Sequence, residues 1–291
     1  MPDPLFRLEL FKNRMFATGN LSSFLSALAR GGLQLLLVIW LQGIWLPLHG
    51  YSFAATPLWA GLYTMPLAVG FVVTGPLSGW LSDRFGARVF STGGMVITAA
   101  GFVLLTVLPG DFERWTFFGL LLLMGIGNGL FAAPNTTSIM NAVPPSARGV
   151  ASGMRGTFQN TGTMVSIVVF FSILTVGLAA TLPTVLYQGL TGHGLPAATA
   201  HRIASLPPIG VLFAAFLGDN PLQALIPPAV AQHLSPQTQA VLFGKQFFPQ
   251  LILPAFITGL HAALYVSAVL ALIAAVASLL RGRRYIYGQE E

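Results

Sequence analysis

The chain has 291 residues, of which 54% are hydrophobic and only 8% are charged. A soluble domain has about a quarter of its residues charged, so this composition excludes a protein that faces water throughout and requires a lipid environment. The formal net charge of +6 does not indicate nucleic-acid binding, because the basic residues lie at the ends of apolar runs and form no basic patch. Cysteine is absent, which excludes disulfides, thiolate nucleophiles and cysteine-based metal sites.

The amino-terminal stretch mixes Arg7, Lys12 and Arg14 with aliphatic and aromatic side chains. This mixture predicts that residues 1–20 form a cytoplasmic interfacial segment on the membrane surface, with a disordered tail as the alternative. The stretch lacks the apolar core of a signal peptide.

Six apolar runs are long enough to cross a bilayer, since about 20 helical residues at 1.5 Å each cover the hydrocarbon layer. They predict an all-α membrane protein with six transmembrane helices. The expected spans are residues 21–46, 58–81, 90–108, 115–140, 150–176 and 251–280.

The interval at residues 177–250 differs from the spans because it is rich in proline, and its best apolar run, residues 209–218, is too short to cross a bilayer. We expect a long extracytoplasmic loop whose short helices lie on the membrane face. The last span follows this loop, and residues 281–291 form a polar cytoplasmic tail.

A charged turn joins the second and third spans with the pattern G-x-x-x-D-R-x-G-x-R. Its first glycine predicts close helix packing and its second a tight turn. We predict that Asp83 pairs with Arg148, between spans four and five, as a latch that holds one access state. The alternative is that the arginines only keep the loop at the cytoplasmic surface. The members of this candidate switch loop are Gly79, Asp83, Arg84, Gly86, Arg88 and Arg148.

Polar side chains inside the spans are candidates for a substrate cavity. Arg30 and Gln34 are four residues apart and share one helix face, and a cation at membrane depth is expected to face protein or water. The alternatives are a hydrogen bond to a neighbouring helix or snorkelling to the interface. Amides on spans four and five can bind a substrate or another helix. The candidates are Arg30, Gln34, Asn128, Asn135, Gln159 and Asn160.

Two glycine pairs have the spacing at which helix backbones approach closely in membranes. Gly125 and Gly129 lie in span four, and Gly149 and Gly153 lie at the start of span five. Both pairs predict close packing.

The basic residues predict the orientation, because cytoplasmic loops carry an excess of lysine and arginine. Six spans place nine cations on one side and three on the other, so we expect both termini to be cytoplasmic and the protein to lie in the cell (inner) membrane. The nine are Arg7, Lys12, Arg14, Arg84, Arg88, Arg148, Arg281, Arg283 and Arg284, and the three are Arg114, Arg202 and Lys245.

The ordered motifs resemble the fourteen-span drug:proton antiporters of the major facilitator superfamily. The charged turn carries this resemblance together with the stretches at residues 10–16, 41–43, 60–66, 127–134 and 148–153. The resemblance implies a carboxy-terminal six-helix bundle, which is one half of the major facilitator fold. In that family the proton-carrying carboxylates typically lie in the other half, and none of the eight acidic residues here lies within an expected span.

The function that this resemblance implies is secondary-active efflux, by drug:proton antiport, of hydrophobic or amphiphilic small molecules. The chain would be either a truncated carboxy-terminal half or a split half that works with a separately encoded amino-terminal half. The alternatives are a non-transporting membrane subunit, an inactive remnant and a membrane-embedded enzyme. No H-E-x-x-H or G-x-S-x-G motif occurs. We therefore assign no catalytic residue, cofactor or metal, and expect membrane lipids and a small-molecule substrate as partners.

Overall fold

The computed structural model describes residues 7–218 and 220–281, so the expectations for residues 1–6 and 282–291, including Arg283 and Arg284, lie outside the described residues. The described chain is helical and contains no strand. Six helical segments are long and apolar enough to cross a membrane, which confirms the all-α class and the number of spans. The long helices are α1 (Arg14–Trp40), α3 (Thr56–Phe85), α4 (Ala87–Val107), α5 (Arg114–Asn141), α6 (Arg148–Gly192) and α12 (Phe247–Leu279).

The first helix begins earlier than expected, at Arg14, inside the segment that the sequence assigns to the interface. The side chain of Asn13 accepts hydrogen bonds from the backbone N–H of Met15 at 2.9 Å and of Phe16 at 3.3 Å. This cap satisfies amides that a helix start leaves open, so the helix begins there. A short 3₁₀ helix, η1 (Leu8–Lys12), precedes it, and a π-helical turn, η2 (Leu41–Trp45), leads into α2 (Leu46–Leu48).

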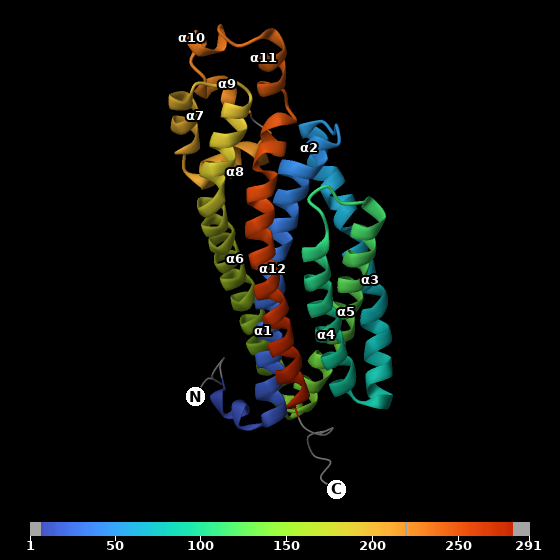
Figure 1. Ribbon diagram of the computed structural model, residues 1–291. Coiled ribbons are helices and arrows are strands. Elements are labelled where there is room, and N and C mark those ends of the chain that lie inside the picture. Colours follow the sequence, from blue (N-terminus) through green and yellow to red (C-terminus); the bar gives the residue numbers. More distant parts are fainter. Residues whose placement is uncertain (1–6, 219, 282–291) are drawn as a thin grey trace.

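The six long helices pack as two sets of three (Figure 1). Helices α3, α4 and α5 form one set, and α1, α6 and α12 form the other, while α12 also contacts α4 and α1 contacts α5. The N-terminal segment lies at one end of the bundle, with the turn between α3 and α4 and the end of α12. We call this end the turn end.

Close glycine packing joins α3, α4 and α5. A Cβ on Gly125 would overlap the backbone of Leu67 and Gly70 on α3, and one on Gly129 would overlap Phe71. The prediction for this pair is confirmed.

The predictions of close packing at Gly79, Gly149 and Gly153 are wrong. Gly149 and Gly153 have open space where a Cβ would stand, and a Cβ on Gly79 would make an ordinary contact with Ala133 at 3.7 Å. These glycines lie on faces of α3 and α6 that do not approach another backbone. Spacing alone therefore does not show which face of a helix is packed.

Helix α6 is the largest departure from the expected elements, because it continues past residue 176 to Gly192. Its buried positions recur at every fourth residue, and the exposed Pro183 does not interrupt the helix. A four-residue step advances about 40° around a helix with 100° per residue, so the buried stripe winds around α6. The stripe consists of Gly162, Ser166, Phe170, Leu174, Leu178, Leu182, Leu186 and Leu190.

The winding stripe explains how α6 changes partners along its length. The 45 residues of α6 extend about 68 Å, roughly twice the hydrocarbon layer. The lower part of the stripe packs on α1, and the upper leucines belong to the same apolar core as residues of the short helices beyond the bundle. Short helices are expected in this interval, and the structure gathers them at the end of the molecule to which α6 extends (Figure 1).

We call these short helices the cap. They bury apolar side chains against α6 and α12, among them Ile203, Leu212 and Leu242. The cap consists of α7 (Ala197–Ala204), α8 (Pro208–Phe216), α9 (Leu222–Leu225), α10 (Pro228–Ala231) and α11 (Pro236–Leu242).

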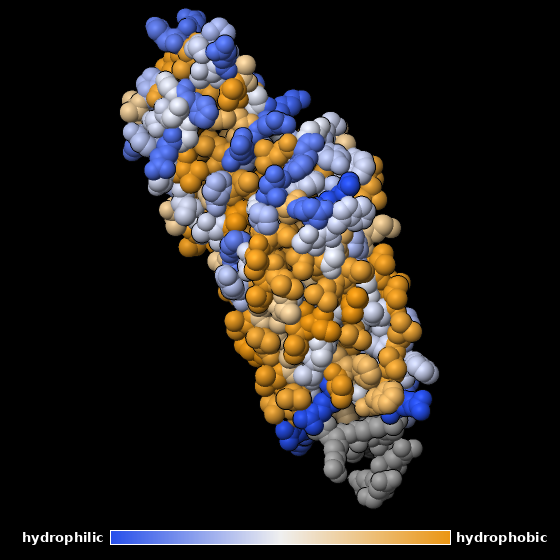
Figure 2. Space-filling model, turned by 45° about the vertical axis from the view of Figure 1, so that its right-hand side comes forward, coloured by the Kyte–Doolittle hydropathy of each residue, from blue (hydrophilic) through white to orange (hydrophobic). Residues whose placement is uncertain are grey.

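The surface of the bundle is apolar between two more polar ends (Figure 2). Helix α3 contributes strongly, with exposed side chains such as Leu58, Val72 and Trp80. A soluble monomer does not tolerate such a band, so lipid or another helical bundle covers it.

Candidate functional site

Helix α1 carries a cation, Arg30, in its middle that has no acidic partner among the described residues. The Nε of Arg30 donates to the backbone oxygen of Ser26 at 3.2 Å, within the same helix. Elsewhere in the described part of the chain, the Nε2 of His49 lies 3.1 Å from the Oδ1 of Asp111. Gln34, one turn further along, is exposed on the surface of this bundle. A cation and an amide at this depth are costly against lipid, which favours a protein- or water-facing wall.

Helix α6 carries a second cation and two of the expected amides. The Nη1 of Arg155 donates to the Oε1 of Gln159 at 3.3 Å, and Asn160 is exposed. The Nε of Arg155 is buried and has no hydrogen-bond partner among the described residues. The sequence places Arg155 in a span, but the site prediction did not include it. Its i, i+4 relation to Gln159 is the signal that identifies it.

A direct contact holds α1 and α6 together beside these side chains. The Oγ of Ser166 accepts from the backbone N–H of Gly32 at 2.7 Å and donates to the backbone oxygen of Leu28 at 2.5 Å. Gly31 gives α6 room, because a Cβ there would lie 2.9 Å from the backbone of Thr163. The two helices that carry Arg30 and Arg155 are therefore neighbours in close contact.

The two amides of α5 have different surroundings. The Nδ2 of Asn135 donates to the backbone oxygen of Gly19 at 3.2 Å and to the Oγ of Ser23 at 2.7 Å, and its Oδ1 accepts from Arg281. Asn135 thus joins α1, α5 and the end of α12. This agrees with the second of the two roles considered for these amides, a hydrogen bond to another helix. The Oδ1 of the buried Asn128 has no partner among the described residues.

Arg281 is buried at the turn end, although the sequence suggests only that it marks the cytoplasmic side. Its side chain is 4% exposed, and burial lowers its pKa to about 10. Its Nε and Nη1 have no hydrogen-bond partner in the described ranges. The contact with Asn135 orients this guanidinium toward the interior of the bundle.

The candidate switch loop lies at the turn end. Gly86 has φ +88°, a conformation that favours glycine, so the predicted tight turn is confirmed. Asp83, Arg84 and Arg88 are exposed beside it.

The structure does not bring Asp83 and Arg148 together as an ion pair. The Nε of Arg148 donates instead to the backbone oxygen of Met140 at 3.3 Å, near the end of α5. In this conformation Arg148 binds the carboxyl-terminal end of α5, where backbone carbonyl groups attract a cation. The predicted latch between Asp83 and Arg148 belongs to one access state only.

The arrangement of helices and polar side chains defines a class of protein. The chain is a multi-pass helical membrane protein with uncompensated arginines and amides on neighbouring spans. A family model described as Major Facilitator Superfamily matches residues 19–178, more than half of the chain. The chain therefore belongs to the major facilitator superfamily, as the sequence resemblance predicts.

Curated relatives of this chain are named as resistance and transport proteins. The methyl viologen resistance protein SmvA of Salmonella typhimurium is 27% identical over 62% of this chain and 34% of its own length. The multidrug resistance protein Stp of Mycobacterium tuberculosis is 31% identical over 62% of this chain and 32% of its own length.

A third relative aligns with nearly the whole chain. The tetracenomycin C resistance and export protein of Streptomyces glaucescens is 25% identical over 95% of this chain and 46% of its own length. The chain thus spans between about a third and a half of the length of these curated relatives.

Proposed function

We propose that this chain is the carboxy-terminal bundle of a secondary-active exporter of hydrophobic or amphiphilic small molecules, driven by proton antiport. The observation that carries the proposal is the uncompensated Arg30, with Gln34 on the same face of α1, in a bundle of the major facilitator superfamily. The printed names of the relatives support export, since they refer to resistance and export.

The proposal includes a partner bundle. Major facilitator transporters place their substrate between two helical halves that rock against each other. The described spans contain acidic residues only near their ends, so the proton-carrying group is proposed to lie in the other half. That half is supplied by the same polypeptide or by a separate one, and it covers part of the exposed apolar surface.

The proposed orientation places the turn end in the cytoplasm of a cell membrane and the cap outside. The support is the excess of cations at the turn end, where Arg84, Arg88 and Arg148 are exposed and Arg281 is buried.

Two observations favour opposite charges for the substrate. Arg30 and Arg155 lie on neighbouring spans and have no acidic partner in the part of the chain that the structure describes, which favours an anionic amphiphile. The name of SmvA, in contrast, refers to methyl viologen, a cation. One relative, RibZ of Clostridioides difficile, is named as a riboflavin transporter, so substrates differ among the relatives.

An efflux assay tests the proposal. Cells that express the chain alone, or together with an amino-terminal bundle, are loaded with ethidium as the cation or with carboxyfluorescein as the anion. We expect energised extrusion of one dye only when both bundles are present, and loss of extrusion when a protonophore is added. Arg30→Gln is expected to slow extrusion of an anionic dye about tenfold, the size of one charge-assisted contact.

The matched control is Arg14→Gln, which removes an exposed cation at the start of the same helix. It should leave extrusion unchanged. If neither dye moves with both bundles present and inserted, the chain is a non-transporting membrane subunit instead.

A further inference from the structure

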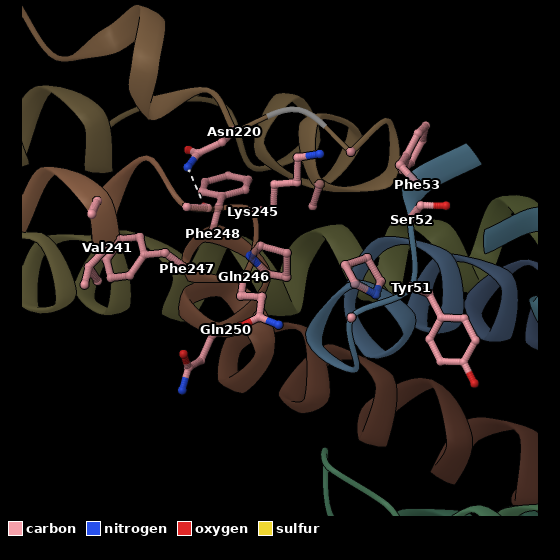
Figure 3. Close-up of a pocket in the computed structure, with 17 residues that line it drawn as sticks. Tyr51, Ser52, Phe53, Asn220, Val241, Lys245, Gln246, Phe247, Phe248 and Gln250 are labelled. Carbon is pink, nitrogen blue, oxygen red and sulfur yellow. Dashed lines mark hydrogen bonds between the residues drawn. The ribbon is translucent and has the colours of Figure 1, made fainter. Parts of the chain in front are cut away.

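A cavity of about 640 Å³ opens where the cap meets the bundle, at the end opposite the turn end (Figure 3). Three separate segments form its walls: the turn after α2, the cap and the first turn of α12. Its volume lies in the range of sites that hold small organic molecules. The proposed transport path does not use this cavity.

Specific contacts keep the walls of the cavity in place. The Nδ2 of Asn220 donates to the backbone oxygens of Leu242 at 2.7 Å and Gly244 at 3.0 Å, which fixes the chain between α11 and α12. On the opposite wall, the ring of Phe53 lies against Gly218, where a Cβ would overlap the ring. Gly218 has φ +76°, so its conformation also favours glycine.

A third contact joins the bundle to the start of α12. The Nε2 of Gln246 donates to the backbone oxygen of Leu48 at 3.3 Å. The walls of the cavity are therefore held together by specific contacts between segments that are far apart in the sequence.

The chemistry of the lining favours an anion with an apolar body. Lys245 is the one charged side chain among the described lining residues, and it forms no hydrogen bond or ion pair within the described part of the chain. Asp219, which precedes Asn220 in the sequence, lies outside the described residues. Figure 3 shows Lys245 extending toward the side on which Ser52 and Phe53 lie.

Aromatic side chains supply the apolar part of the lining. Phe53 is 42% exposed, while Phe247 and Phe248 are buried beneath the cavity. A lysine and aromatic side chains that line one cavity match a molecule with one negative head and one aromatic or acyl body.

We propose that this cavity binds an amphipathic monoanion, with its head on the Lys245 ammonium and its body on the exposed ring of Phe53. The bound molecule would contact the turn after α2 and the cap together, and so hold these segments to each other. A free aromatic carboxylate and the phosphate head of an anionic lipid share this chemistry. This inference does not rest on the proposed function, because it concerns binding alone.

Calorimetry on the full chain in phosphatidylcholine nanodiscs tests the proposal. The probes are 1-naphthoate and its neutral counterpart 1-naphthamide, which differ mainly in charge. We expect naphthoate to bind the unaltered chain about tenfold more tightly than naphthamide, and Lys245→Gln to remove this preference while Lys245→Arg retains it. Adding phosphatidylglycerol to the nanodiscs distinguishes the two kinds of ligand. If this lipid competes with naphthoate, the cavity binds a lipid headgroup; if it does not compete, the cavity binds a free anion.

The control is Arg202→Gln, which removes a cap cation that donates to the backbone oxygen of Leu225 and does not line the cavity. It should leave naphthoate binding unchanged. Equal binding of the two probes, or equal losses in the Arg202 and Lys245 variants, would overturn the proposal. Thermal unfolding of each variant shows whether it is folded, and Lys245 is exposed, so its replacement leaves packing intact.

Discussion

At the scale of single residues, local hydrogen bonds decide where the membrane helices begin. Asn13 caps α1, and the Oε2 of Glu113 accepts from the backbone N–H of Thr116 at 2.8 Å at the start of α5. The hydrogen bond from the Thr116 backbone is the main cause that lowers the pKa of Glu113 below its ordinary value. The carboxylate is therefore favoured in the folded state.

Glu113→Ala is expected to lower the melting temperature at neutral pH. Because the pKa of Glu113 is lower in the folded state than in the unfolded state, its stabilisation is present above pH 4.5 and is lost as the pH falls through the folded pKa. The difference in melting temperature between the variant and the unaltered chain should shrink below that pH. Fluorescence-detected unfolding in detergent measures this. Glu113→Asp retains a capping carboxylate and should keep most of the stability, whereas a pH-independent difference would contradict the assignment.

At the scale of helices, close glycine contacts decide which faces pack. In α5, a Cβ on Gly125 would overlap backbone atoms of α3, which cannot move aside as a flexible side chain can. Gly119 on the same helix has open space at the position that an added Cβ would occupy. Substituting each glycine by alanine raises the helix propensity equally, but only the substitution at Gly125 disturbs packing. A comparison of the two variants therefore isolates the effect of packing.

Gly125→Ala is expected to destabilise the bundle by about 1–3 kcal/mol through overpacking. Gly119→Ala should be neutral or stabilising by up to about 1 kcal/mol, since alanine favours helix more than glycine does. Unfolding in mixed micelles with rising denaturing detergent measures both. Equal effects of the two substitutions would show that α3 and α5 do not approach closely at Gly125.

At the scale of the whole molecule, the orientation in the membrane is the property on which the proposed transport depends. The chain contains no cysteine, so single cysteines report their own accessibility. Ser146, between α5 and α6, lies on the turn-end side, and Gln237 lies in α11 of the cap; both are exposed.

In intact cells, a membrane-impermeant maleimide should label Gln237→Cys and should label Ser146→Cys only after permeabilisation. The physical reason is the excess of cations at the turn end, which are retained in the cytoplasm. Labelling is read as a mass shift on a gel. Labelling of Ser146→Cys in intact cells would reverse the proposed orientation, together with the placement of the cap cavity outside the cell.

The site is only partly readable from the sequence. Arg30 and Gln34 can be selected as candidates from the sequence because an i, i+4 polar pair in an apolar run is a local pattern, and their role in a substrate cavity stays a prediction. The structural role of Asn135 was not separable from a substrate-binding role, because its partners Gly19 and Ser23 lie over a hundred residues away. Whether Asp83 and Arg148 pair in another access state stays a prediction.

The sequence by itself determined membrane residence and six spans, because the thickness of the hydrocarbon layer sets a run length and each run satisfies it locally. The superfamily was indicated by the resemblance of the ordered motifs, which are also local stretches of sequence. Only the tertiary structure decided that α6 continues to Gly192, that Gly125 packs and Gly149 does not, and that a cavity forms beside Lys245. These features depend on which distant segments meet. The leucines at every fourth position of α6 bury their side chains only because the cap and α12 lie against them.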